Sequence, residues 1–209
     1  KRTAGMPCAV IITCLFYGAI SGSAPATVAA VGSMTIPLLV KMGYDKTFVT
    51  AIVAVAGGLG VIIPPSIPFI LYGMASGTSV GKMFMAGIVP GLLIAALLMI
   101  YAFYYCKKHG EDKDKINEEV NALHDKGFKK VFFDSFWALL TPVIILGCIY
   151  SGVASPTEAA VISVFYALFI SMFIYKSLHV KDLYEVFVES IKTFAPILFI
   201  LASAVADRK

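Results

Sequence analysis

Small hydroxyl residues cluster between positions 21 and 27, inside a long stretch that carries no charge. Ser21, Ser23 and Thr27 alternate there with Gly22 and Pro25. This spacing favours a turn between two helical arms, because Gly often ends a helix and Pro is preferred at its first position. The end of the first arm would offer free carbonyl oxygens, which suit Na+. The start of the second arm would offer free N–H groups, which suit a carboxylate.

A second interruption follows in the next uncharged stretch, where three glycines and three prolines gather: Gly57, Gly58, Gly60, Pro64, Pro65 and Pro68. The prolines would expose the carbonyls of Val61 to Pro64, and Ser66 would cap the helix where it resumes. No Asp or Glu lies near either break, so a bound cation would rely on carbonyls, hydroxyls and helix dipoles. Irregular backbone inside a membrane needs protein or a water-filled cavity around it. Two breaks in succession therefore predict a transport site.

Two other interpretations of these residues remain open. Small residues also let membrane helices pack closely, and packing alone is the favoured interpretation of residues 26–33 and of Gly73, Gly77 and Gly81. A nucleophilic serine would need a histidine at its own depth. The three histidines, at positions 109, 124 and 179, lie in or beside the charged segments. This placement disfavours an intramembrane hydrolase built on Ser21 or Ser23.

The composition places the chain in a membrane. Of its 209 residues 59% are hydrophobic and 14% are charged, and the mean hydropathy is +0.86. Soluble domains are about 25% charged, so a soluble globular protein is excluded. No basic stripe with interleaved aromatic residues occurs, so the net charge of +4 does not indicate nucleic-acid binding. We predict an all-α polytopic membrane protein.

The uncharged stretches define the expected helices. A helix needs about 20 apolar residues to cross a bilayer. Residues 6–40 would form two arms too short to cross, which predicts a re-entrant helical hairpin. Residues 47–74 would form a discontinuous transmembrane helix, and residues 83–106 one further crossing. Residues 135–206 would supply more transmembrane helices, with Pro156-Thr157-Glu158 as a helix start.

The basic residues predict which side of the membrane these helices face. With the hairpin re-entrant, 13 of the 17 Lys and Arg residues fall on one side, Lys41, Lys176 and Lys181 among them. The positive-inside rule makes that side the cytoplasm. Residues 107–134 hold seven Lys and seven Asp or Glu and share that side. Ile116, Val120 and Leu123 recur there at helical spacing, so we expect a cytoplasmic amphipathic connector.

Motifs along nearly the whole chain, in their order and spacing, are Ser21-Gly22-Ser23-Ala24, Gly43-Tyr44-Asp45, Ile63-Pro64-Pro65-Ser66-Ile67-Pro68, Ser79-Val80-Gly81-Lys82 and Pro156-Thr157-Glu158-Ala159-Ala160. Together they resemble the large membrane subunit of TRAP transporters, the tripartite ATP-independent periplasmic family. The resemblance implies a multi-pass protein of the bacterial inner membrane that takes up an organic acid anion with Na+. Sialic acid and C4-dicarboxylates are the expected substrate classes. A small membrane subunit and a periplasmic substrate-binding protein are the expected partners.

The resemblance also implies an elevator-type ion-transporter fold, present in part. Residues 1–106 would be half of a transport domain, residues 107–134 the connector, and residues 135–206 scaffold-like helices. The family's hairpin tip maps onto residues 21–27 and its unwound helix onto residues 57–68. The implied Na+ ligands are Ser21, Gly22, Ser23, Gly60, Val61 and Pro64. The implied substrate-binding residues are Ser23, Ala24, Pro25, Thr27, Pro65 and Ser66.

The chain departs from the family pattern in two ways. Many dicarboxylate-type members carry Asp just after the tip, where this chain has Pro25-Ala26-Thr27, a variant associated with sialic-acid and related branches. A second hairpin and a second Pro-Pro break are expected beyond Lys209, so the chain would be about half of the subunit. Outside the family, the alternatives are a passive anion channel, which more often carries rings of charge, and an intramembrane serine hydrolase.

Overall fold

The computed structural model describes residues 3–113, 115–117 and 128–206, which form helices and turns without a β-strand. The predicted all-α fold is thereby confirmed. In chain order the elements are α1 (Gly5–Ser21), α2 (Ala24–Lys41), α3 (Lys46–Gly57), the 3-10 turn η1 (Gly58–Val61), α4 (Ile67–Ser76), α5 (Val80–His109), α7 (Phe128–Tyr150), α8 (Pro156–Phe169), the π-helical turn η2 (Ile170–Ile174), the 3-10 turn η3 (Val180–Asp182) and α9 (Leu183–Ala206).

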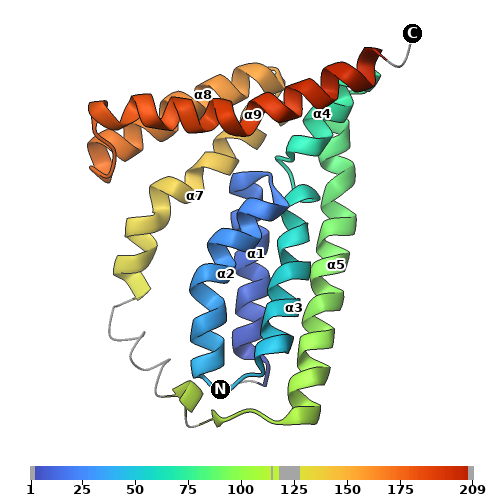
Figure 1. Cartoon of the computed structure of the whole chain (residues 1–209), viewed down its shortest axis with the longest axis vertical. Helices are drawn as coiled ribbons and strands as arrows, with labels where there is room; N and C mark the ends of the chain where they lie inside the picture. The colour runs from blue at the N-terminus through green and yellow to red at the C-terminus, as the bar shows by residue number, and fades with distance from the viewer. Residues whose placement is uncertain (1–2, 114, 118–127, 207–209) are drawn as a thin grey trace.

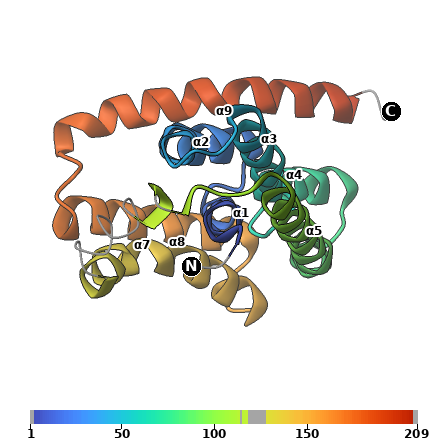
Figure 2. The same ribbon diagram turned by 90° about the horizontal axis from the view of Figure 1, so that it is seen from below.

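Helices α1, α2, α3 and α5 lie side by side and form the main body of the molecule (Figure 1). Seen along their axes, α1 is flanked by α2, α3 and α5 (Figure 2). The start of α1, the α2–α3 turn and the end of α5 lie at one end of this body. The α1–α2 turn and α4 lie at the other end (Figure 1). The core between the helices contains many small and branched apolar side chains, among them Ile11, Cys14, Val53, Leu59 and Ala95.

Among the described residues, three stretches are long and apolar enough to cross a membrane, namely Ala24–Lys41, Val80–His109 and Pro156–Ile174. By length and composition they agree with a polytopic membrane protein. The arms of the hairpin have 17 and 18 residues in α1 and α2, about 25 and 27 Å at 1.5 Å per residue. Because α2 is itself long enough to cross, arm length does not separate a re-entrant hairpin from two crossings. Re-entry stays a prediction.

The predicted discontinuous helix is present as α3, η1 and α4. Asp45 caps α3, since its Oδ1 accepts the backbone N–H of Phe48 at 2.8 Å. The helix tightens into η1 at the glycines, and the chain then turns through Pro64 and Pro65, which are joined by a cis peptide bond. Proline supplies no backbone N–H and cannot continue the helical ladder. The interruption therefore lies where the glycines and prolines predicted it.

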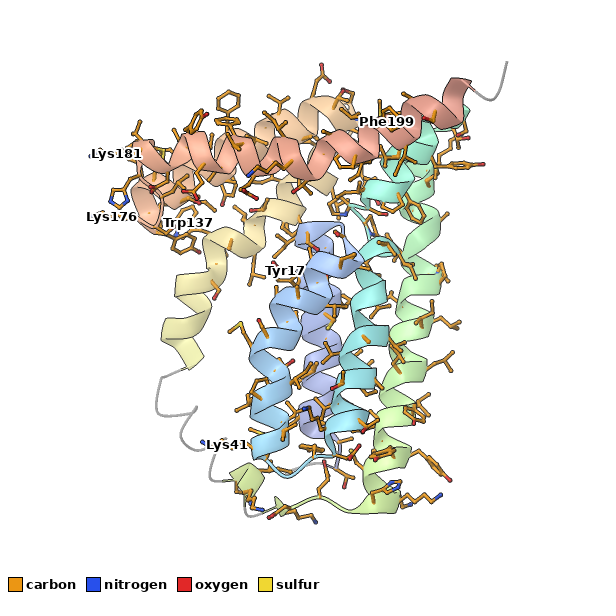
Figure 3. The ribbon with its side chains drawn as sticks, viewed as in Figure 1. Tyr17, Lys41, Trp137, Lys176, Lys181 and Phe199 are labelled. Carbon is orange, nitrogen blue, oxygen red and sulfur yellow. The ribbon has the colours of Figure 1, made fainter. Side chains whose placement is uncertain are left out.

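Helices α8 and α9 differ in direction from the helices of the body. Residues 135–206 are expected to supply transmembrane helices, and Pro156–Ile174 has the length and composition of one. Both α8 and α9 run across the end of the body (Figure 1). Lys176 and Lys181 consequently lie far from Lys41 instead of on the same side (Figure 3). The physical reason is sparse packing. Among the apolar side chains described beyond Cys106, only Ala159 and Ile170 are buried, so few contacts hold α8 and α9 alongside the body.

Of the predicted connector, residues 107–134, the structure describes residues 107–113, 115–117 and 128–134; α5 extends into it as far as His109 and α7 begins within it at Phe128. Val120 and Leu123 lie outside the described residues. Ile116 is described, and its side chain packs against the apolar core of the body. At this position of the expected amphipathic helix, the apolar side chain therefore packs against the protein's own core.

Candidate functional site

The turn of the α1–α2 hairpin lies against the break between α3 and α4, and we call this contact the tip junction. The carbonyl of Gly22 accepts the backbone N–H of Ile67 at 3.2 Å. Gly22 has a φ of +62°, and a Cβ on it would lie 2.9 Å from the carbonyl oxygen of Pro65. Only glycine fits this position, because it alone tolerates both the left-handed backbone and the close approach.

A network of hydroxyl groups fixes the shape of the turn. Thr27 donates its hydroxyl to the carbonyl of Ser23 at 2.8 Å, and that carbonyl also accepts the N–H of Thr27 at 3.0 Å. The hydroxyls of Ser21 and Thr27 are 2.9 Å apart. The Ser21 hydroxyl also lies 3.2 Å from the Ser23 carbonyl oxygen, so either hydroxyl can be the donor in the bond between Ser21 and Thr27. Thr27 is fully buried, so its side chain holds Ser21 and Ser23 in place within the turn.

The predicted Na+ ligands belong to one connected cluster. A Cβ on Gly60 would lie 3.0 Å from the carbonyl oxygen of Ser23 and 2.6 Å from the Thr27 hydroxyl, so η1 touches the turn directly. The carbonyl of Val61 accepts the Ser66 hydroxyl at 2.7 Å. Pro64 precedes Pro65, which has no N–H to donate. A carbonyl oxygen has two lone pairs, so those of Gly22 and Val61 keep one each for a further partner.

Free backbone N–H groups, which the prediction assigns to anion binding, are distributed unequally between the starts of α2 and α4. At the start of α4, Ile67 donates its N–H to Gly22, Pro68 has none, and Phe69 donates to the Ser66 hydroxyl at 3.5 Å. At the start of α2, the N–H groups of Ala24 and Ala26 have no such partner within the described part of the chain. Free donors at a helix start therefore remain at α2, beside the predicted residues Ser23, Ala24 and Pro25.

Ser23 is the one tip hydroxyl that the turn does not use. It occupies the N-cap position of α2 with an extended backbone, φ −137° and ψ 125°, yet its side chain makes no capping hydrogen bond. In most helices a serine at this position accepts an N–H from the first turn. The Ser23 hydroxyl is thus available to a ligand at the tip junction.

The electrostatics of the tip junction come from backbone dipoles and hydroxyls. Among the residues that the structure describes, no group of three His, Cys, Asp or Glu side chains could hold a metal ion. The described histidines are engaged elsewhere, His109 with the Tyr105 carbonyl at 3.1 Å and His179 with Asp182. His124 lies outside the described residues. A cation at the tip junction would be held by carbonyl and hydroxyl oxygens, as K+ and Na+ are in other membrane proteins.

Sequence reasoning missed two contacts of the tip junction. Ile67 takes part through its backbone N–H, which no residue type signals. Gly18 and Gly60 meet so closely that a Cβ on Gly18 would lie 2.6 Å from the Cα of Gly60. Gly18 stands in α1 four residues before Gly22, which caps the end of that helix. Small residues at this spacing on one helix face are a known signal for close helix contact.

Comparison with known proteins adds family information to this geometry. The sequence model of the family described as "Tripartite ATP-independent periplasmic transporter, DctM component" matches residues 1–206. The isethionate TRAP transporter permease protein DctMQ of Oleidesulfovibrio alaskensis is 48% identical over 200 residues, covering 96% of this chain and 31% of that protein.

Two further relatives differ in the solutes for which they are named. The C4-dicarboxylate TRAP transporter large permease protein DctM of Pseudomonas aeruginosa is 39% identical over 203 residues, covering 96% of this chain and 45% of that protein. The ectoine TRAP transporter large permease protein TeaC of Halomonas elongata is 38% identical over 199 residues, covering 95% and 45%. The chain thus spans a third to a half of the length of these relatives.

Proposed function

The chain belongs to the DctM component family of tripartite ATP-independent periplasmic transporters, and from this premise we propose that it forms part of a permease that moves a small organic acid across a membrane with Na+. The observation that supports this most is the tip junction. It brings the ends of two interrupted helices together in an apolar body, and such ends supply the partial charges that transporters use for ions and anions.

Na+ would bind on the carbonyl side of the tip junction. We assign its ligands to Ser21, Gly22, Ser23, Gly60, Val61 and Pro64. The free lone pairs of the Gly22 and Val61 carbonyls and the unused Ser23 hydroxyl support this assignment. Because no acidic side chain is present in this cluster, each ligand is a neutral oxygen, which suits a weakly held ion that must be released on the other side.

The substrate's acidic group would lie at the start of α2. In the part of the chain that the structure describes, the N–H groups of Ala24 and Ala26 are free at this helix start, whereas the first N–H groups of α4 already donate to acceptors within the protein. Pro65 and Ser66 would border the site from the other break. With Na+ bound nearby, the negative charge of the substrate is compensated. Uptake of the anion would therefore depend on Na+.

The substrate class follows from the relatives only in outline. Three of them are named for isethionate, C4-dicarboxylates and ectoine. Sialic acid and C4-dicarboxylates are the candidates that the sequence favours, and isethionate joins them because that relative is 48% identical. The whole protein would work in the bacterial inner membrane with a small membrane subunit and a periplasmic substrate-binding protein. Residues 107–134 would face the cytoplasm.

We further propose an elevator motion in which the hairpin and the broken helix move together. Hydrogen bonds and glycine contacts join these two units at the tip junction, so one cannot shift without the other. Residues 135–206 would belong to the part against which they move. A body with interdigitated contacts moves as a unit because packed interfaces do not deform continuously.

The proposal is tested by uptake into proteoliposomes with the full-length protein and its partner subunits. Ser23→Ala should raise the Na+ concentration needed for half-maximal uptake several-fold while leaving assembly intact, because the Ser23 hydroxyl makes no capping bond. Ser33→Ala is the matched control, since Ser33 is exposed on α2 and bonds only to the Ala30 carbonyl. Uptake that ignores a Na+ gradient would refute the coupling. Currents without saturable counterflow would favour a channel.

A further inference from the structure

A single carboxylate joins three elements at the end of the body opposite the tip junction. Glu111 follows Gly110, whose φ of 77° turns the chain back after α5. Both carboxylate oxygens of Glu111 accept the backbone N–H of Ala4, each at 3.0 Å. The Tyr44 hydroxyl donates to the same carboxylate. The start of α1, the α2–α3 turn and the chain after α5 therefore share one anchor.

The anchor satisfies a charge requirement of α1. Ala4 is the N-cap residue of this helix and is fully buried, and the helix has neither a side-chain cap nor an acidic residue in its first turn. The start of a helix carries partial positive charge and unpaired N–H groups. Glu111 supplies the missing negative charge from 107 positions away in the sequence. The contact is therefore electrostatically matched as well as sterically close.

The α2–α3 turn completes the anchor. Tyr44 is 9% exposed, and burial together with the hydrogen bond to Glu111 raises the pKa of its hydroxyl above the usual value. The phenol thus remains a hydrogen-bond donor at neutral pH. A Cβ on Gly43 would lie 3.3 Å from the Cβ of Asp112, so the segment after Glu111 also packs on this turn.

The geometry of α1 connects the anchor to the tip junction. From its start beside Glu111, α1 rises for 17 residues, about 25 Å, to the turn that contains Gly22. Near that far end Gly18 meets Gly60 with no space for even a methyl group. A small axial shift or tilt of α1 would therefore separate the turn from η1.

We propose that Glu111 is a positioning residue for the tip junction. Its carboxylate fixes the base of α1 to the end of α5 and to the α2–α3 turn, and so keeps Gly22 and Ser23 in register with Gly60. The consequence for Na+ dependence rests on the proposed function. The consequence for order at the tip junction does not.

Hydrogen exchange of the full-length protein in detergent or lipid tests the positioning role directly. Glu111→Ala should speed amide exchange about tenfold at Ala4 and Cys8 and also at Gly22 and Thr27, whose N–H groups are hydrogen-bonded, since hydrogen bonds to a charged acceptor are lost at the base. Glu189→Gln is the control, because Glu189 forms only an exposed pair with Lys192 on α9. Faster exchange at the base with an unchanged tip would overturn the proposal, because a merely local contact predicts that pattern.

Two milder variants keep the test decisive if Glu111→Ala does not accumulate in the membrane. Glu111→Gln and Tyr44→Phe preserve side-chain size and should each give a smaller increase in exchange at the tip. The double variant Glu111→Gln/Tyr44→Phe should increase exchange at the tip by less than the sum of the free-energy changes of the two single variants, because both remove the same interaction. Additive effects would overturn the shared anchor.

Na+-dependent uptake provides the functional arm. In Glu111→Gln the Na+ concentration for half-maximal uptake should rise about three- to tenfold, at an unchanged amount of protein in the membrane. If amide exchange at the hairpin turn becomes faster while the Na+ concentration for half-maximal uptake stays unchanged, the order of the tip junction does not determine Na+ binding, and that part of the proposal is overturned. If the unmodified protein shows no Na+ dependence, the proposed function fails, while the exchange measurement still decides the positioning role.

Discussion

Gly18 and Gly60 touch backbone to backbone, and a Cβ on Gly60 would lie 2.6 Å from the Thr27 hydroxyl and 3.0 Å from the Ser23 carbonyl oxygen. This contact presses the 3-10 turn of the broken helix into the turn of the hairpin. The oxygens that we assign to Na+ share a cluster because neither glycine carries a side chain. The two chain breaks can lie this close together only because neither Gly18 nor Gly60 has a Cβ atom.

Gly60→Ala should therefore reduce both stability and Na+-driven uptake. The added methyl group would meet the buried Thr27 hydroxyl and the backbone carbonyl oxygen of Ser23, and overpacking of this kind costs about 1–3 kcal/mol. Gly58→Ala is the matched control in the same 3-10 turn, because nothing lies within 4 Å of its Cβ and its φ is −59°. Thermal unfolding and uptake should be reduced in Gly60→Ala and nearly normal in Gly58→Ala. Equal behaviour of the two variants would contradict the contact.

Thr27→Val tests the hydroxyl network that shapes the hairpin turn. Valine keeps the shape of threonine but removes the bonds to Ser21 and to the Ser23 carbonyl, leaving a part-buried polar group without its partner. The free energy of unfolding should fall by about 1–3 kcal/mol, and the Na+ requirement should rise. Thr35→Val is the control, because Thr35 on the same helix bonds only to the Val31 carbonyl, at 2.7 Å. If Thr27→Val raises the requirement for substrate but not for Na+, a direct role in substrate binding is the better assignment.

The positions of both chain breaks could be predicted because glycine and proline act locally. Pro64 and Pro65 are adjacent and neither can donate a backbone hydrogen bond, so the helical ladder is interrupted at two successive positions. A single proline, such as Pro37 or Pro90, stays inside its helix. The tip junction itself could not be predicted in the same way. The bond from Ile67 to Gly22 joins backbone atoms of two residues far apart in the sequence. Every residue type except proline carries such an N–H, so the sequence shows no sign of it.

The directions of α8 and α9 were also beyond sequence reasoning. Their apolar runs have the length of membrane crossings, and counting these crossings was the argument for placing Lys176 and Lys181 on the same side of the membrane as Lys41. Orientation depends instead on what each helix packs against. In α9 the side chains of Tyr184, Phe199 and Ile200 are 67 to 79% exposed within the described structure, so these residues do not direct the helix along the body.

Because of the hydrogen bond between Tyr44 and Glu111, the folded protein should lose stability as the pH becomes alkaline. The pKa of the Tyr44 hydroxyl is raised in the folded protein by burial and by its bond to Glu111, so the neutral phenol is favoured there. This contribution to stability is complete below the usual tyrosine pKa of about 10 and is lost as pH rises above it. The thermal midpoint should fall between about pH 9 and about pH 11 more steeply in the unmodified protein than in Tyr44→Phe. Tyr72→Phe, exposed on α4, should retain the full slope. Parallel slopes for the unmodified protein and Tyr44→Phe would exclude Tyr44 as the titrating group.

Ser66→Ala tests whether the Ser66 hydroxyl stabilises the break between α3 and α4. The Ser66 hydroxyl is fully buried, donates to the Val61 carbonyl at 2.7 Å and accepts the N–H of Phe69. Its loss removes a helix cap and frees a carbonyl that we assign to Na+, so stability should fall by about 1–2 kcal/mol. Ser79→Ala removes the exposed cap of α5, which accepts the N–H of Lys82 at 3.5 Å, and should cost less. Thermal unfolding measures the first effect and Na+ titration of uptake the second. Because a freed Val61 carbonyl is no longer aimed by Ser66, the Na+ requirement should rise in Ser66→Ala alone, and equal Na+ requirements in both variants would remove Val61 from the ligand set.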